Sequence, residues 1–268
     1  MKGSHSYILA TGQHDVDRLR LLNQVYGPGS EALLRRAGLA PGMRVVEMGC
    51  GSGNMSCWLA SQVGETGSVV GFDASPEQIE QARRQAQERG LKNLTFELAS
   101  AYTPGLPAES FDLAYGRLVL MHLVRPADAL LALHGLVRPG GRLVCEEMDV
   151  SGLLCDPPAP AMERFVDLNL QLGDQRGVQF RLGRSLHRLF RLLGINHFEV
   201  GGNCPFAVRG ENKRLIWLTF VEFAPRLLRE GLATQAEAEA VGEALHHLAE
   251  DETTLLGFPP LGQVWAVK

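Results

Sequence analysis

The chain has 268 residues, a mass of 29.2 kDa, 45% hydrophobic and 21% charged residues, and a formal net charge of −4. This composition indicates one large α/β domain, or a domain plus a cap, with a sizeable core. The acidic balance argues against nucleic acid or an anionic membrane as partner. No apolar run is long enough to span a bilayer, and the N-terminus lacks the apolar core of a signal peptide. We therefore expect a cytoplasmic protein.

The cysteines and histidines do not form the patterns of a metal site. An odd number of scattered thiols without a CxxC pair indicates reduced cysteines rather than a disulfide framework or a zinc ribbon. His246 and His247 are adjacent, so on a helix they point apart and make a poor metal pair. We expect no metal. The five cysteines are Cys50, Cys57, Cys145, Cys155 and Cys204.

Strand and helix patterns alternate along most of the chain. The most clearly marked helix begins at Ser75, a typical N-cap, which is followed by Pro76 in the first turn and by Gln78 completing a capping box. Strands that alternate with helices of this length form a parallel, doubly wound sheet. The chain is predicted to begin with a helix over about 15–37 that is broken at 26–30. Five strands follow, at 44–48, 68–73, 93–98, 111–116 and 142–147, and the helices between them end near 64, 90 and 136. The rest of the chain is predicted to form helices at 157–173, 182–194, 211–229 and 234–250 and strands at 197–202 and 262–268.

A glycine-rich turn, Gly49-Cys50-Gly51-Ser52-Gly53, follows the first strand. A P-loop would need Gly-Lys-Ser/Thr, but the residue after Gly53 is Asn54. Asn54 also takes the third-glycine position of a dinucleotide fingerprint, and none of the four tyrosines has a lysine four residues later, as a short-chain dehydrogenase requires. The turn suits a nucleoside without phosphates, such as S-adenosylmethionine, and Asp73 ends the second strand where it can accept both ribose hydroxyls.

Four segments resemble, in order, the motifs of class I S-adenosylmethionine-dependent methyltransferases, most closely the type that includes the ubiquinone/menaquinone-biosynthesis enzymes. They are VVEMGCGSG, VVGFDASPEQIEQAR, FDLAYGRLVLMHL and LVRPGGRLVCEE, and together they cover roughly residues 40–150. The resemblance implies a Rossmann-like, doubly wound and mostly parallel seven-stranded sheet. It also implies a final antiparallel strand, which GQVWAVK would supply, and a helical cap over the carboxyl edge.

The resemblance also implies a cofactor site. The glycines of the turn would pass under the methionine portion, Asp73 would hold the ribose, and Ala74 would lie beside the adenine. Ser100 stands where the family's acidic residue meets the adenine amine, which is a departure from the pattern. Tyr7 and Arg18, on the leading segment, are placed to contact the methionine carboxylate. The predicted cofactor-binding residues are Tyr7, Arg18, Glu47, Gly49, Cys50, Gly51, Gly53, Asn54, Asp73, Ala74, Ser100, Ala101 and Arg117.

Methyl transfer needs a base only when the acceptor must lose a proton. The catalytic candidates are His122, shortly after the fourth strand, and Asp149, at the end of the fifth. Glu146 and Glu147 point to opposite faces, so at most one of them faces the cleft. A helix rich in arginine, at 182–194, is expected to pack on the sheet with a solvated basic face. The apolar candidates for an acceptor pocket are Phe165, Leu168, Phe180, Trp217, Phe220 and Phe223.

The chain is thus interpreted as one methyltransferase domain, with a lid at 1–40, a cofactor-binding core at 41–150 and a cap at 151–268. We predict methyl transfer from S-adenosylmethionine, with S-adenosylhomocysteine as product, to an oxygen, nitrogen or carbon of a small, partly apolar molecule such as a specialised metabolite or a quinone. The alternatives are a non-catalytic S-adenosylmethionine-binding module and a nicotinamide-dependent oxidoreductase. A hydrolase is disfavoured because no G-x-S-x-G elbow occurs. We expect a monomer or homodimer with no nucleic-acid or membrane partner.

Overall fold

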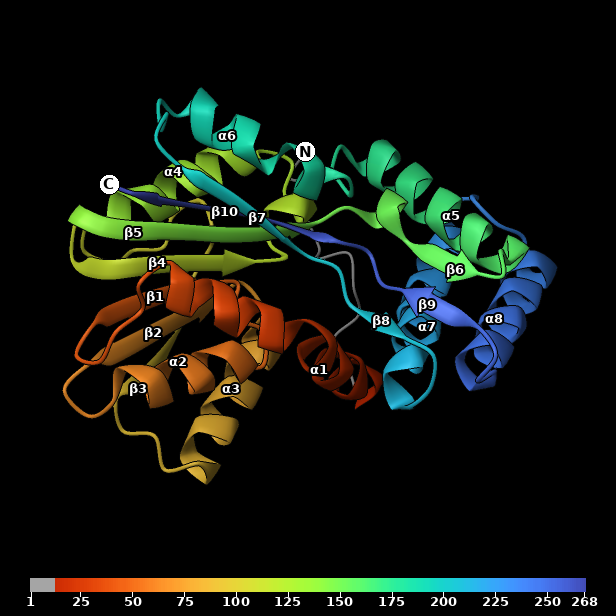
Figure 1. Cartoon of the computed structure of the whole chain (residues 1–268), viewed down its shortest axis with the longest axis horizontal. Helices are drawn as coiled ribbons and strands as arrows, with labels where there is room; N and C mark the ends of the chain where they lie inside the picture. The colour runs from red at the N-terminus through yellow and green to blue at the C-terminus, as the bar shows by residue number, and fades with distance from the viewer. Residues whose placement is uncertain (1–12) are drawn as a thin grey trace.

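The computed structural model describes residues 13–268, with side chains from residue 17 onward. Its central sheet has seven strands: β1 (Arg44–Met48), β2 (Ser68–Asp73), β3 (Leu94–Leu98), β4 (Phe111–Arg117), β5 (Val137–Met148), β7 (Glu199–Asn203) and β10 (Leu261–Val267). Their order across the sheet is β3-β2-β1-β4-β5-β10-β7 (Figure 1). The first five strands are parallel, whereas β10 is antiparallel to both β5 and β7. The expected doubly wound sheet with a final antiparallel strand is confirmed.

Alternation along the strands divides the core between the two faces of the sheet. Val45, Leu113 and Val144 pack with residues of α2, α3 and the end of α1, whereas their neighbours in sequence belong to the core that includes α4 and α6. The chain order reverses between β1 and β4, and in such sheets ligands bind at the carboxyl ends of the strands beside this point. The helices are α1 (Gln13–Arg36), α2 (Asn54–Val63), α3 (Pro76–Glu88), α4 (Pro126–Leu136) and α6 (Leu186–Leu192).

The cap lies beyond the carboxyl edge of the sheet, on the right in Figure 1. It contains α5 (Pro160–Arg176), α7 (Arg214–Arg229) and α8 (Gln235–Glu250), with a small sheet in the order β6-β9-β8 built from Leu154–Asp156, Leu255–Gly257 and Phe206–Ala207. These three strands are too short to show a period in the sequence, and they were not predicted. The 3-10 helices are η1 (Leu120–His122), η2 (Val150–Gly152), η3 (Leu182–Ser185) and η4 (Glu211–Lys213).

Helix α6 packs on α4 and on strand β10 of the sheet, as the sequence predicts. Arg181, Arg184, Arg188 and Arg191 are all exposed.

Within residues 13–268, no helix combines the length and apolar character needed to cross a membrane.

The first helix differs from its prediction, because α1 continues through the segment where a break was expected. Pro28 lies inside it, and three contacts from the C-terminal part of the chain support this region. The Tyr26 hydroxyl donates to the Pro259 carbonyl at 2.8 Å, and Asn203 Nδ2 donates to the Tyr26 carbonyl at 3.3 Å. A Cβ on Gly29 would lie 2.1 Å from the same Asn203 nitrogen. Gly29 therefore permits a close approach to β7, and the helix continues through Pro28.

Gly183, in η3, lies directly against the backbone of β5. A Cβ at this position would be 2.4 Å from the Glu147 carbonyl oxygen and 2.9 Å from the Asp149 amide nitrogen. Backbone atoms cannot move aside as a flexible side chain can. We expect Gly183→Ala to lower the free energy of unfolding by about 1–3 kcal/mol, measured by urea denaturation.

Gly135→Ala is the matched control. Gly135 lies in α4, and an added Cβ there would meet nothing within 4 Å. Because alanine favours helix, this variant should be up to about 1 kcal/mol more stable than the original chain. Equal changes in the free energy of unfolding in Gly183→Ala and Gly135→Ala would show that the close approach of η3 to β5 does not require a glycine.

Candidate active site

A cleft of about 830 Å³ lies at the carboxyl ends of the first strands, between the sheet and the cap. The described residues predicted to bind the cofactor line this cleft, with one exception. Gly53 is not part of the lining, and a Cβ there would lie 2.9 Å from the Phe96 ring and 3.0 Å from Ala82. It therefore allows close packing at the start of α2. Tyr7 lies outside the described residues. The predicted residues in the lining are Arg18, Glu47, Gly49, Cys50, Gly51, Asn54, Asp73, Ala74, Ser100, Ala101 and Arg117.

The glycine turn leaves its backbone open to the cleft. Gly49 and Gly51 have φ of +66° and +52°, a backbone conformation that residues with a side chain rarely adopt. A Cβ on Gly49 would lie 2.2 Å from a methyl of Val119, in the segment after β4. Glycine at these positions thus lets the chain turn sharply and lets the segment after β4 approach it. A ligand in this cleft can contact the backbone directly.

Asp73 fixes the wall beside this turn. One carboxylate oxygen accepts the Gly51 backbone N–H at 3.1 Å, and the other accepts the Ser75 N–H at 2.9 Å. Burial raises the pKa of Asp73, and these backbone donors oppose the rise. Each oxygen keeps a lone pair for a further donor. The Ser75 hydroxyl accepts the backbone N–H of Gln78 and so caps α3, as predicted. The backbone N–H of Ser75 is donated to Asp73 rather than to the side chain of Gln78.

Glu47 is a second carboxylate of the cleft, and it is buried. It accepts a hydrogen bond from the Ser56 hydroxyl. Burial raises its pKa to about 7, while the bond to Ser56 and the positive charge of Arg117 act in the opposite direction. Arg117 also donates to Ser30 Oγ at 3.2 Å and to Asn23 Oδ1 at 3.1 Å. It thereby ties α1 to the end of β4, beside the cleft.

The two glutamates of β5 are buried and have structural partners. Glu146 accepts from the Tyr115 hydroxyl at 2.6 Å and from Gln263 Nε2 at 2.7 Å. Glu147 accepts the backbone N–H groups of Val119, Leu120 and Met121 at 3.1, 2.8 and 3.2 Å. Burial raises the pKa of Glu147 to about 8.

Glu147 therefore holds the segment that carries His122, although it does not line the cleft itself. Sequence reasoning missed this role, since nothing in the motif RLVCEE shows that its second glutamate binds three backbone amides.

A smaller, apolar cavity of about 100 Å³ adjoins the cleft. The two share Arg18, Leu19, Leu22, Leu118 and His122. Of the predicted acceptor-pocket residues, the cavity is lined by Phe165, Phe180 and Phe223. The other three point elsewhere: Leu168 and Phe220 belong to the core, and the Trp217 ring packs 4.5 Å from that of His246. Asn169 and Thr219 give the cavity a few polar atoms.

His122 lies where the cleft and the apolar cavity meet. Its ring is half-buried and packs edge-on against Phe180, with 5.5 Å between ring centroids. Burial, helped by the charge of Arg18, lowers its pKa to about 4. The imidazole is therefore neutral at pH 7, with one ring nitrogen as a donor and the other as an acceptor.

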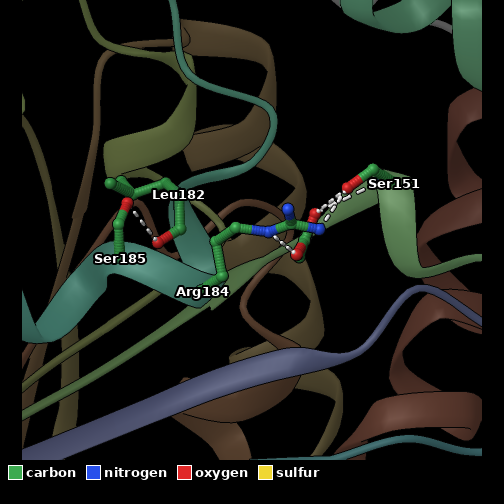
Figure 2. Close-up of polar contacts among 5 residues, drawn as sticks. Ser151, Leu182, Arg184 and Ser185 are labelled. Atoms are coloured by element: carbon green, nitrogen blue, oxygen red, sulfur yellow. Dashed lines mark hydrogen bonds and ion pairs between the residues drawn. The ribbon is translucent and has the colours of Figure 1, made fainter.

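The catalytic prediction for Asp149 is not supported by its position, because it lines neither cavity. Its carboxylate accepts from the Arg184 guanidinium and from the Ser151 hydroxyl, the latter at 2.6 Å. Arg184 also donates to that hydroxyl at 2.5 Å, and Figure 2 shows it reaching toward Ser151. Asp149 accepts the Ser151 N–H as well and caps η2. The chain turns at the end of β5, so this side chain faces η3 rather than the cleft.

The cysteines and the other side chains that can bind a metal are dispersed. Among residues 13–268, no three His, Cys, Asp or Glu side chains are grouped as a metal site would require. Cys57 is buried in α2 beside Gln85, whereas Cys155 belongs to the small sheet and Cys204 is exposed.

The sheet order, the glycine turn and the acidic residue that ends β2 define a class I S-adenosylmethionine-dependent methyltransferase. The chain belongs to the methyltransferase domain family, whose model matches residues 39–177.

Individual relatives match shorter stretches of sequence. Aklanonic acid methyltransferase DauC of Streptomyces sp. strain C5 is 37% identical over 124 residues, which cover 46% of this chain and 56% of that protein. The ubiquinone/menaquinone biosynthesis C-methyltransferase UbiE of Ectopseudomonas mendocina is 30% identical over 138 residues, which cover 49% and 54%. The chain thus spans about half the length of these curated relatives. The crystal structure of YcgJ from Bacillus subtilis matches with a TM-score of 0.60 at 18% identity, covering 89% of this chain and 97% of that one, and shows the shared fold.

The position of Asp149 gives a testable expectation. Asp149→Asn removes the ion pair with Arg184, whose side chain is 58% exposed, so solvent screening keeps the loss of stability to about 1 kcal/mol. The melting temperature should fall, while affinity for S-adenosylhomocysteine should stay within about twofold. A large loss of that affinity at an unchanged melting temperature would place Asp149 in the site after all.

Proposed function

We propose that this protein transfers the methyl group of S-adenosylmethionine to an oxygen, nitrogen or carbon of a small, partly apolar acceptor. The proposal rests on the position of the two cavities, which adjoin each other. The cleft contains the glycine turn and Asp73, and it shares His122 and Leu118 with an apolar cavity in the cap. A donor and an acceptor bound in these two spaces would meet at that boundary.

The sheet side of the cleft, where the glycine turn lies, fits S-adenosylmethionine better than a phosphate-bearing nucleotide. It carries Glu47 and Asp73, no lysine is found among the described lining residues, and Arg176, Arg226 and Arg229 lie on the opposite, cap side. Asp73 would accept the ribose hydroxyls, and Glu47 would face the positively charged end of the ligand. The open backbone at Gly49 and Gly51 would lie against the amino-acid portion. When bound, this cofactor supplies an electrophilic methyl group on a sulfonium.

The apolar cavity would hold part of the acceptor. Phe165, Phe180 and Phe223 would exclude water, which leaves positioning as the main contribution of the protein. The neutral His122 imidazole would accept a hydrogen bond from an acceptor hydroxyl and orient it toward the cleft. The names of the two curated relatives support a small organic acceptor, since one refers to aklanonic acid and the other to ubiquinone and menaquinone biosynthesis.

Calorimetric titration with S-adenosylhomocysteine, and with NADH in parallel, tests the cofactor. We expect micromolar or tighter binding of S-adenosylhomocysteine alone. Asp73→Ala should weaken it by about 10- to 100-fold, the size of one or two charge-assisted hydrogen bonds. Asp128→Asn, an exposed carboxylate on α4, serves as control and should bind normally.

Failure of the original chain to bind S-adenosylhomocysteine would overturn the proposal, and binding of NADH in its place would support the oxidoreductase alternative. Release of S-adenosylhomocysteine during a screen of phenols, quinols and amines would separate an enzyme from a non-catalytic binding module.

The pKa of about 7 at Glu47 predicts a pH dependence of binding. A cationic ammonium beside Glu47 favours the ionised carboxylate, so binding releases the proton that Glu47 carries at lower pH. Affinity for S-adenosylhomocysteine should therefore rise up to about tenfold between pH 6 and pH 8. The pKa of His122, about 4, lies below this window. In Glu47→Gln most of this dependence should be lost, and any remaining slope is expected to come from Glu147, whose pKa is about 8. An unchanged slope in this variant would show that another group titrates.

A further inference from the structure

The two sides of the cleft differ in charge. On the sheet side the three carboxylates Glu47, Asp73 and Glu77 outnumber the single arginine, Arg117. Three arginines lie on the cap side: Arg176 at the end of α5, and Arg226 and Arg229 in the last turn of α7. We propose that these three arginines bind an oxyanion of the acceptor, a carboxylate or a phosphate, while its apolar part enters the small cavity. This inference rests on the proposed function and specifies the substrate class of the same site.

Burial distinguishes Arg226 from ordinary surface arginines. Cations are often found at the ends of helices, where they interact favourably with the helix dipole, but that interaction does not require burial. Arg226 is only 9% exposed although it lines the cleft. Its pKa is lowered, first by burial and then by the positive charges of Arg176 and Arg229. The charges of Arg176 and Arg229 therefore act on a buried guanidinium, that of Arg226, and a bound anion would offset their repulsion.

Acidic residues near the cluster offset only part of its charge. Glu230 pairs with Arg176 at 3.3 Å, and Glu222, which also lines the cleft, precedes Arg226 by four residues on α7. Arg18, on α1, and Arg117, at the end of β4, are the other two arginines of the described lining. The carboxylate of the cofactor is predicted to lie near Arg18, so an anionic group of the acceptor would meet the arginines of α5 and α7 instead.

The planar, forked guanidinium suits carboxylate and phosphate oxygens, which it can bind through two parallel hydrogen bonds. The sheet side of the cleft, with its carboxylates, would repel the same group. An anionic acceptor would therefore bind in one orientation, with the charged end at the cap and the methylated end near His122.

The test uses the full chain saturated with S-adenosylhomocysteine and two matched pairs of probes. They are 6-hydroxy-2-naphthoate with 6-hydroxy-2-naphthamide, and 2-naphthyl phosphate with 2-naphthol. We expect one anion or both to bind at least tenfold more tightly than the neutral partner, and to lose affinity as salt is raised. The pair that shows the larger preference identifies the carboxylate or the phosphate. Equal binding within both pairs, or no binding of either anion, would overturn the inference.

Variants of the arginines test which of them produce the preference for the anion. Arg229 is exposed, so Arg229→Gln should fold normally, and we expect it to reduce the preference for the anion at least threefold. Arg226→Gln with Arg229→Gln should remove most of the preference. Arg188→Gln, an equally exposed arginine on α6, is the control and should leave the preference unchanged. A preference that is the same in Arg229→Gln and in Arg188→Gln would overturn the inference.

Affinity for S-adenosylhomocysteine, measured on the same samples, separates this inference from the proposed function. If the original chain binds S-adenosylhomocysteine but does not distinguish the probes, only the anion site is wrong. If it does not bind S-adenosylhomocysteine, the proposed function fails and the inference fails with it.

Discussion

The carboxylate of Asp73 bonds to two backbone N–H groups that belong to different elements. One is in the glycine turn after β1, and the other begins α3. The turn is also close to Val119, which belongs to the segment that Glu147 holds by three amides. The half-buried Asp73 and the buried Glu147 thus fix the three segments that form the sheet side of the cleft. Their hydrogen bonds order the wall that a ligand would meet.

Regular elements were predictable because their signals are local. The Ser75-Pro76 cap and the alternation in β3 act over a few residues, and the structure reproduces the bounds of these elements closely. Features that depend on distant contacts could not be predicted in this way. Continuity of α1 depends on Pro259 and Asn203, more than 170 residues away. The contacts of Asp149 could not be predicted for the same reason, since its partner Arg184 comes from another element.

The cofactor side of the site was easier to predict than the acceptor side. Gly49, Gly51 and Asp73 lie in one motif-bearing stretch, and all of them line the cleft. The acceptor side combines residues from α1, η1, α5 and α7, and the sequence does not indicate which apolar positions face inward. The arginines of the cap illustrate the difficulty. Arg176 and Arg229 resemble any cation near a helix end until the structure brings them to one cavity.

The contacts of α1 also bear on the order in which the protein folds. Tyr26 and Gly29 pack against Pro259 and Asn203, and β10 lies between β5 and β7 in the sheet. A chain emerging from the ribosome makes its first five strands long before these partners exist. The glycine turn could then form early, from local contacts, while the helix that flanks the cleft waits for the last strand. Loop closure over such distances is slow, so we expect completion of the cleft to be a late event in folding.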